Sequence, residues 1–98
     1  MLTHHVLFWL KADMTPEQKT AFKQSLETLK GVETVQSLYI GTPAPIDRAV
    51  VDSSYTFSLV VLFNDLAGHD VYQTHQLHLA FLDSFKVYFE KIIIYDAA

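Results

Sequence analysis

The sequence predicts an α+β fold in which four strands and two helices follow one another in the order β-α-β-β-α-β. Short runs of branched and aromatic residues occur at four places, and two longer segments carry apolar residues at helical spacing. Half of the 98 residues are hydrophobic and only 18% are charged, so the chain is not disordered. Its length fits one domain, which we expect to span residues 1–98.

The first strand is expected over His5–Leu10, where five successive apolar residues begin at Val6. Such a continuous run is typical of a strand that is buried on both faces. A helix should begin after Thr15, because Pro16 suits a first helical position and the glutamine three residues after Thr15 completes a capping box. We expect Gly31 to end this helix.

The second half of the chain is expected to contribute three more strands and one interrupted helix. The strands are expected at residues 35–40, 55–63 and 92–96, and a long loop at residues 42–53. Residues 66 to 85 have helical periodicity, with a break expected either near Gly68 or around His75–Gln76. This order is that of the ferredoxin-like fold, a four-stranded antiparallel sheet with both helices on one face.

The predicted strands lack the polar residues that one water-exposed sheet face would require. The first, third and fourth strands all contain unbroken apolar runs, so the face without helices would be a larger apolar patch than monomers expose. We therefore expect this face to close against the same face of a second copy, giving a homodimer. If His5 points toward the helices, the dimer face contains Val6, Phe8 and Leu10.

Charge and composition exclude several classes of partner and location. Seven basic and eleven acidic residues give a net charge of −4 without a basic cluster, so we expect no nucleic-acid partner and no binding to membrane surfaces. No segment resembles a membrane span or a signal peptide, which favours a cytoplasmic location. The chain has no cysteine, which removes thiolate chemistry, and too few glycines for a phosphate-binding loop. We expect no cofactor.

The candidate chemical groups are His5 and the block Tyr72-x-x-His75-x-x-His78. A three-residue step places the three rings of the block along one side of a helix. A metal site made by His75 and His78 with His5 is disfavoured, because no carboxylate stands at a ligand spacing and no cysteine is present. We therefore expect no metal. The alternative for the same residues is purely structural, because buried tyrosine and histidine usually have a hydrogen-bond partner.

Two further histidines, His4 and His69, are expected to be structural or exposed rather than functional. Each stands outside the three-residue step of the block. Neither belongs to a recognised nucleophile or metal motif. His75 is likewise expected to be structural or exposed, so the functional hypothesis rests on His5, Tyr72 and His78.

The opening His5-Val-Leu-Phe, the Tyr72-to-His78 block and the ending Glu90-Lys-Ile-Ile-Ile-Tyr-Asp96 resemble the stress-responsive dimeric α/β-barrel (Dabb) family. The resemblance covers His5 to Asp96. It implies the ferredoxin-like fold and a dimer whose two sheets close into a barrel. One departure is Gln76, because the family usually has proline there.

The resemblance also implies chemistry, through a plant polyketide cyclase of this family that carries out an aldol closure. It implies that His78 acts as the base, that Tyr72 donates to the developing oxyanion and that His5 orients or polarises the substrate. Imidazole and phenol suit these roles. The chain departs from that cyclase at Phe57, where the cyclase has another histidine, and at Leu26, where it has a tyrosine.

The expected function is therefore binding of a small apolar ligand, with cofactor-free lyase, cyclase or isomerase chemistry. The wall of the pocket is expected to contain Leu7, Trp9, Phe22, Leu26, Leu59, His75, Leu79, Phe81, Ile92 and Ile94. One alternative is a non-catalytic stress-response or binding dimer in which the same residues are structural. A weaker alternative is a cofactor-free or haem-degrading monooxygenase.

Overall fold

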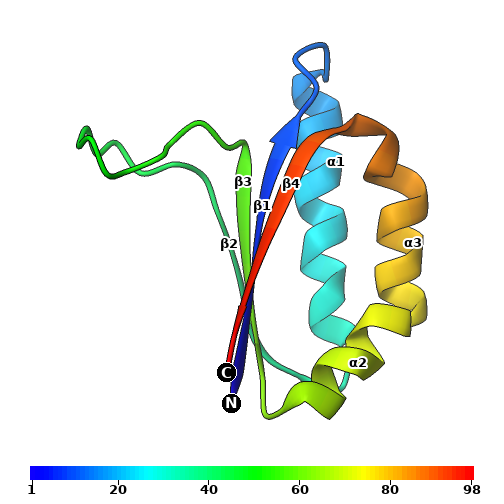
Figure 1. The fold of residues 1–98 in the computed structure, drawn as a ribbon. Helices are drawn as coiled ribbons and strands as arrows, with labels where there is room; N and C mark the ends of the chain where they lie inside the picture. Colours follow the sequence, from blue (N-terminus) through cyan, green and yellow to red (C-terminus); the bar gives the residue numbers. More distant parts are fainter.

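The computed structural model describes residues 1–98 and has two layers, a four-stranded sheet and the helices that cover one of its faces (Figure 1). The elements are β1 (Leu2–Leu10), α1 (Pro16–Glu27), β2 (Val35–Gly41), β3 (Phe57–Phe63), α2 (Leu66–Thr74), α3 (Gln76–Phe85) and β4 (Phe89–Ala97), with 3-10 turns η1 (Thr28–Gly31) and η2 (Lys86–Tyr88). All neighbouring strands are antiparallel in the order β2-β3-β1-β4. The predicted ferredoxin-like fold is confirmed.

The first helix begins with the predicted capping box. The Thr15 hydroxyl accepts from the Gln18 amide at 3.1 Å, and the Gln18 side chain accepts from the Thr15 amide at 2.8 Å. Gly31 closes η1 rather than α1, and no glycine in the chain has a positive φ. A Cβ at Gly31 would lie 2.9 Å from Leu77 Cδ1. The helical segment formed by α1 and η1 therefore ends at Gly31 as predicted, but without the left-handed backbone of a glycine cap, and Gly31 lies in close contact with Leu77 of α3.

The second helical segment is interrupted at His75, the second of the two expected places. His75 is extended (φ −67°, ψ 144°), and its Nδ1 accepts from the Leu77 amide at 3.1 Å, so it caps α3. Gly68 lies within α2 instead, and its amide donates to the Asp65 carboxylate at 2.9 Å. The break turns α3 relative to α2, which positions residues 76–85 over the sheet (Figure 1).

The hydrophobic core lies between the sheet and the helices and is built from alternate residues of β1 and β3. On β1 the inward residues are Leu2, His4, Val6 and Phe8, so the odd-numbered residues face the other way. The expectation that His5 faces the helices is therefore wrong. Both faces of this strand carry large apolar side chains, so hydrophobic patterning leaves the orientation of the strand open.

The sheet face away from the helices is uncovered. Side chains on this open face are Thr3, His5, Leu7, Trp9, Tyr39, Val60, Leu62, Ile93 and Tyr95. The expected dimer residues Val6 and Phe8 belong to the core instead. Only 16 of the 98 residues are buried, and the accessible surface of 6135 Å² exceeds the roughly 5,700 Å² usual for a monomer of this mass. The chain alone thus exposes more surface than a compact monomer of its mass.

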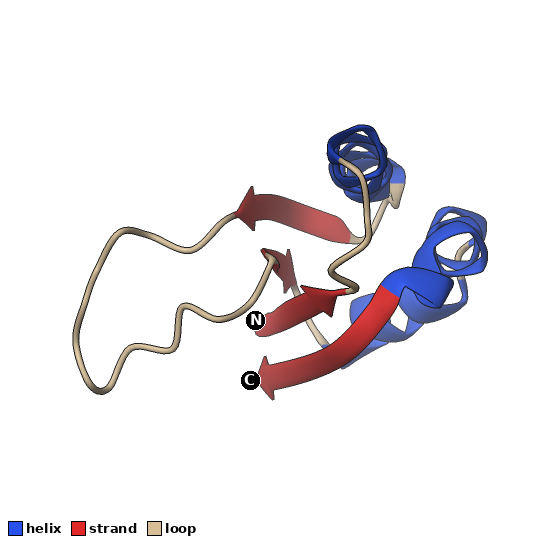
Figure 2. Cartoon of the chain, turned by 90° about the horizontal axis from the view of Figure 1, so that it is seen from above, coloured by secondary structure: helices blue, strands red, loops and turns tan.

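The long loop between β2 and β3 extends away from the sheet on the side opposite the helices (Figures 1 and 2). It spans residues 42–56 and carries exposed apolar side chains at Ile46 and Val50. Figure 2 shows the loop projecting to the side of the strands away from the helices. It is therefore a projecting arm at the open face.

None of the helices combines the length and apolar character that a membrane span requires.

Candidate functional site

An apolar cavity of about 160 Å³ lies between the sheet and the two C-terminal helices. Its lining residues come from β1, β3, β4, α2 and α3 and are His4, Val6, Phe8, Leu59, Tyr72, Gln73, His78, Phe81, Leu82, Ile92 and Ile94. Eight of these eleven are hydrophobic. An apolar cavity with a few polar groups is the usual form of a small-molecule site.

Tyr72 and His78 meet at this cavity because the chain bends between them at His75. Their ring centroids lie 4.7 Å apart. His78 Nδ1 donates to the Gln73 carbonyl at 3.1 Å, so the neutral ring carries its lone pair on Nε2. Burial lowers the pKa of His78, which favours this neutral form. The predicted pair is thus brought together, with the imidazole in a form that accepts a proton.

The Tyr72 hydroxyl belongs to a side chain that is 1% exposed, and it has no hydrogen-bond partner within the chain. Burial raises the pKa of Tyr72 well above its ordinary value, so the phenol stays protonated. A protonated phenol without a partner is a hydrogen-bond donor that is free to serve a ligand.

His4 is the strand-one histidine of the cavity. It is 2% exposed, and its Nδ1 lies 2.5 Å from Asp96 Oδ1. The two residues stand directly opposite each other on β1 and β4. Burial lowers the pKa of His4, and the Asp96 carboxylate opposes this shift by stabilising the protonated ring. With Nδ1–H held by Asp96, Nε2 is the second imidazole nitrogen that can accept a proton.

The predicted third group, His5, is not part of this site. It lies on the open face, where its Nε2 is 2.8 Å from Ser58 Oγ. Leu7 and Trp9 share this face and are likewise absent from the cavity wall. Trp9 donates to Ser54 Oγ at 3.0 Å, outside the core. The physical reason is the orientation of β1, because a shift of one residue moves every side chain to the opposite face.

The remaining predicted lining residues divide into three groups. Leu59, Phe81, Ile92 and Ile94 line the cavity. Phe22 and Leu26 are fully buried residues of α1, and they pack in the core rather than at the cavity. His75 caps α3 and Leu79 is 51% exposed, so neither reaches the cavity.

Sequence reasoning missed His4, Gln73 and Asp96 as site residues. Strand register is the signal that could have identified His4 and Asp96. An aspartate directly opposite a buried histidine supplies the hydrogen-bond partner of the buried ring. Register is a property of the paired strands, and a single strand's pattern does not contain it. Gln73 contributes its main-chain carbonyl to His78, a contact that any residue type could make.

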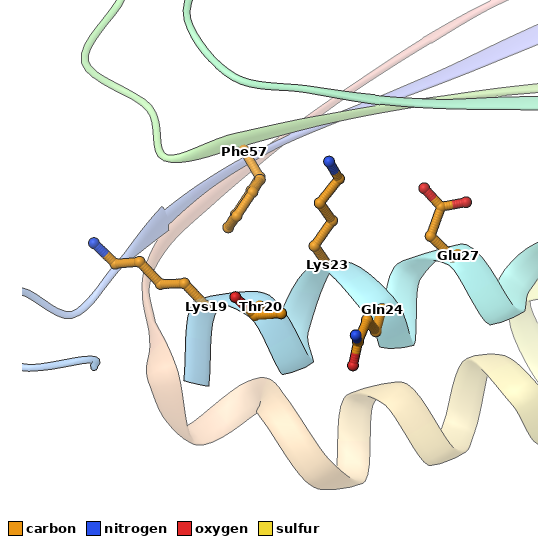
Figure 3. Close-up of a pocket in the computed structure, with 6 residues that line it drawn as sticks. All are labelled: Lys19, Thr20, Lys23, Gln24, Glu27 and Phe57. Carbon is orange, nitrogen blue, oxygen red and sulfur yellow. The ribbon is translucent and has the colours of Figure 1, made fainter. Parts of the chain in front are cut away.

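A wider hollow of about 450 Å³ runs beside α1 (Figure 3). It is lined by Lys19, Thr20, Lys23, Gln24, Glu27 and Phe57. Figure 3 shows its polar side chains spread along one helix, with Phe57 pointing toward that helix from β3. No buried polar group converges there. The smaller cavity is therefore the better candidate site.

Residues 2–98 match the family described as the stress-responsive A/B barrel domain. The chain belongs to this family. Among solved structures, a Dabb family protein with a ferredoxin-like fold from Mesorhizobium loti has 25% identity and a TM-score of 0.78, with 99% of this chain and 94% of that one covered. The family membership predicted from the sequence is confirmed.

Two more distant structures share the fold of this A/B barrel domain. A dimeric ferredoxin-like protein of unknown function from Thermobifida fusca has a TM-score of 0.81 at 21% identity, covering 99% of this chain and 89% of that one. The hydroxynitrile lyase from Passiflora edulis has a TM-score of 0.81 at 19% identity, covering 98% and 90%. No functionally curated protein matches the chain significantly.

Proposed function

We propose that this A/B barrel protein binds a small apolar carbonyl compound in the cavity and moves a proton on it without a cofactor, in a lyase, cyclase or isomerase reaction. The supporting observation is that the only polar side chains facing an otherwise apolar wall are Tyr72, His78, His4 and Gln73. Two imidazoles and one phenol are the groups that such a proton transfer needs.

The size of the cavity limits the ligand. A volume of about 160 Å³ is close to the ~150 Å³ of an apolar cavity that accepts benzene. The proposed ligand is therefore a single six-membered ring, or an aliphatic chain of similar volume, that carries one carbonyl group. Ile92 and Ile94 in the wall are 41% and 47% exposed, so a longer ligand such as a linear polyketide would extend out of the cavity beside β4.

Each polar group has one role in the proposed reaction. His78 Nε2 takes a proton from the carbon next to the carbonyl, and the electron pair of that C–H bond forms an enolate. The Tyr72 hydroxyl donates to the enolate oxygen. His4, with Asp96 behind it, accepts or returns a second proton at Nε2. This replaces His5 with His4 as the strand-one group.

The lyase structure from Passiflora edulis supports the class of reaction only by example, because it places a lyase on the same fold. The pocket of the present chain supplies the separate argument. Its neutral imidazole and its protonated phenol are both in the state that enolate formation requires near neutral pH.

We also propose that two copies associate through their open faces. Leu7, Val60 and Ile93 are apolar residues of this face, and the loop at residues 42–56 projects beside it. Burial of a patch of this kind stabilises association by about 25 cal/mol per Å² before entropy costs. The description of the Thermobifida fusca protein as dimeric supports this arrangement.

Deuterium exchange on cyclohexanone tests the proposed activity, because this ketone has the stated ring size and exchangeable α-protons. The protein in D₂O is expected to exchange these protons faster than buffer, and His78→Ala should lower the rate by about 10²-fold or more. The matched control is His75→Asn, which removes a histidine outside the cavity and keeps a good helix cap. Equal rates for wild type and His78→Ala would contradict the proposal.

A binding dimer without catalysis is the alternative, favoured by the contact between His78 and the Gln73 carbonyl, which also satisfies the ring structurally. NMR chemical-shift changes of the cavity methyl groups on addition of cyclohexanone, without exchange of its α-protons, would support this alternative. Exchange that depends on His78 would exclude it.

A further inference from the structure

A second cluster of titratable side chains lies at the end of the sheet, next to the cavity. His4 from β1, His69 from α2 and Asp96 from β4 place one ligand atom each within 4.8 Å of the others. His69 Nε2 is 3.9 Å from Asp96 Oδ2, and the rings of His4 and His69 meet edge to face with centroids 5.1 Å apart. Of the three, only His4 lines the cavity.

The environment of His69 prepares its Nε2 to bind a cation. Its Nδ1 lies 3.2 Å from the Asp70 carboxylate, which places the ring proton on Nδ1. The Gln73 amide nitrogen lies 3.1 Å from Nε2 and donates to the lone pair there, which places that lone pair on Nε2; a bound metal ion would displace this amide. A carboxylate that holds the second nitrogen of a histidine is the usual support of a metal-bound imidazole.

From this geometry we propose that His4, His69 and Asp96 form a binding site for a divalent transition-metal ion of the zinc class. Two imidazoles and one carboxylate are a common zinc ligand set, whereas Mg²⁺ and Ca²⁺ prefer oxygen ligands. The site is reached from solvent, because the exposed fraction rises from 2% at His4 to 14% at His69 and 42% at Asp96.

Small movements bring the ligands to bonding distance. Tetrahedral zinc with bonds of about 2.0–2.2 Å holds its ligand atoms roughly 3.4 Å apart. Asp96 and His69 lie at the solvent side, where their side chains can make this adjustment. A fourth position at the metal faces solvent.

Metal binding replaces the proton that His4 Nδ1 and Asp96 share, so it releases a proton and becomes weaker at low pH. The remaining proton of the neutral His4 ring then resides on Nε2, which has no partner within the chain. Occupancy would therefore convert the second base of the proposed reaction into a donor. This consequence rests on the proposed function, whereas the metal binding does not.

Direct metal titration tests the site without any assay of activity. Tag-free protein is stripped with EDTA, dialysed and titrated with CoCl₂, and the visible absorption bands of bound Co²⁺ are recorded. One Co²⁺ per chain, displaced by Zn²⁺, is the expected result. His69→Ala should weaken the affinity by about 100-fold or more, because it removes a ligand, and Asp70→Asn by about 10-fold, because it removes the support of that ligand.

His75→Asn is the control, because His75 is half-buried beside Glu33 and belongs to neither site. This variant should bind Co²⁺ like wild type. If His69→Ala fails to fold, Asp96→Asn, which keeps the shape of the side chain, is titrated with Co²⁺ in its place and should also bind more weakly than wild type. Absence of stoichiometric binding by wild type at millimolar CoCl₂, or unchanged binding by the folded ligand variant, would overturn the metal site. Neither result bears on cyclohexanone exchange, so the two proposals fail separately.

Discussion

The Tyr72 hydroxyl is the group whose role differs between a catalytic cavity and a purely structural one. Its ring packs against Phe63 and His78, with centroids 5.2 and 4.7 Å away, and these contacts do not involve the oxygen. A side chain of the same shape without the hydroxyl would therefore keep the packing. No fully buried side-chain nitrogen or oxygen lacks a partner, so the Tyr72 hydroxyl, which has none, is accessible from the cavity that it lines.

Tyr72→Phe is expected to leave the free energy of unfolding within about 0.5 kcal/mol of wild type, because only an unpartnered polar atom is removed. The same variant should lose about 10²-fold in cyclohexanone exchange, because the enolate oxygen loses its donor. Chemical denaturation and NMR exchange rates measure the two effects. A large loss of stability with full exchange would assign the hydroxyl a structural role.

His78 should make stability depend on pH. Burial lowers its pKa below the ordinary value of 6.5, so the unfolded chain binds more protons than the folded chain between these two pKa values. Stability is therefore complete above pH 6.5 and falls as the pH decreases through this window, by at most about 1.4 kcal/mol per pH unit for this one group.

Denaturation curves at several pH values in EDTA-containing buffer measure this slope. In His78→Gln the slope should be smaller than in wild type, although the buried His4 retains part of it. His75→Asn is the control and should keep the wild-type slope. An unchanged slope in His78→Gln would show that His78 does not titrate differently in the folded state.

Two of the three proposed catalytic groups could be predicted from the sequence, and the third could not. Tyr72 and His78 were predicted as part of one helical stripe, and they meet instead because the chain bends between them at His75. His4 and His5 are neighbours on a strand with two apolar faces. Only the pairing of His4 with Asp96 across 92 residues decides which one is inside.

At the scale of elements, the boundary between α2 and α3 controls the geometry of the site. His75 occupies an extended backbone conformation that is also preferred by residues before proline. Gln76 is the first residue of α3, the position that proline favours in helices. The chain therefore keeps a backbone suited to proline although proline is missing.

Gln76→Pro is expected to be tolerated and to raise the free energy of unfolding by about 0.4–1 kcal/mol, because it restricts the unfolded chain at a compatible position. Ala80→Pro, at an exposed position inside the same helix, is the matched control and should cost about 3 kcal/mol or more. Thermal and chemical unfolding measure both. Equal destabilisation by the two prolines would show that Gln76 is not at a true helix start.

Most element boundaries were predictable because they depend on neighbours in sequence. The capping box at Thr15 and the break at His75 are local features. The reason for Gly31 was not predictable, because it depends on Leu77 from a distant helix. Local hydrogen bonding can be inferred from one segment, whereas close packing between segments requires both partners.

At the scale of the whole molecule, composition predicted a second apolar sheet face, but the β1 residues assigned to that face were the wrong ones. Half of the sequence is hydrophobic, and the surplus does lie on the second face of the sheet. The residues on it are odd-numbered along β1 rather than even-numbered. Composition indicates how much apolar surface the chain has, but not which face of the strand each apolar side chain points to.

Leu7→Glu is expected to separate the proposed dimer into folded monomers. Leu7 is on the central strand between Ser58 and Ile93, so a charge there would be desolvated in a face-to-face dimer and hydrated in a monomer. Sedimentation or light scattering measures the mass. Leu79→Glu, on the exposed side of α3, is the control and should keep the wild-type mass. A dimeric Leu7→Glu would place the interface elsewhere.

The alternation along β1 has a consequence for how this protein can change. His4, Val6 and Phe8 line the cavity and the odd-numbered residues form the open face, so the proposed ligand site and the proposed dimer face use alternate positions of one strand. A library that varies Val6, Phe8 and Leu59 would explore new ligands at constant quaternary structure. A deletion of one residue in this strand would exchange the two sets of side chains and abolish both properties together.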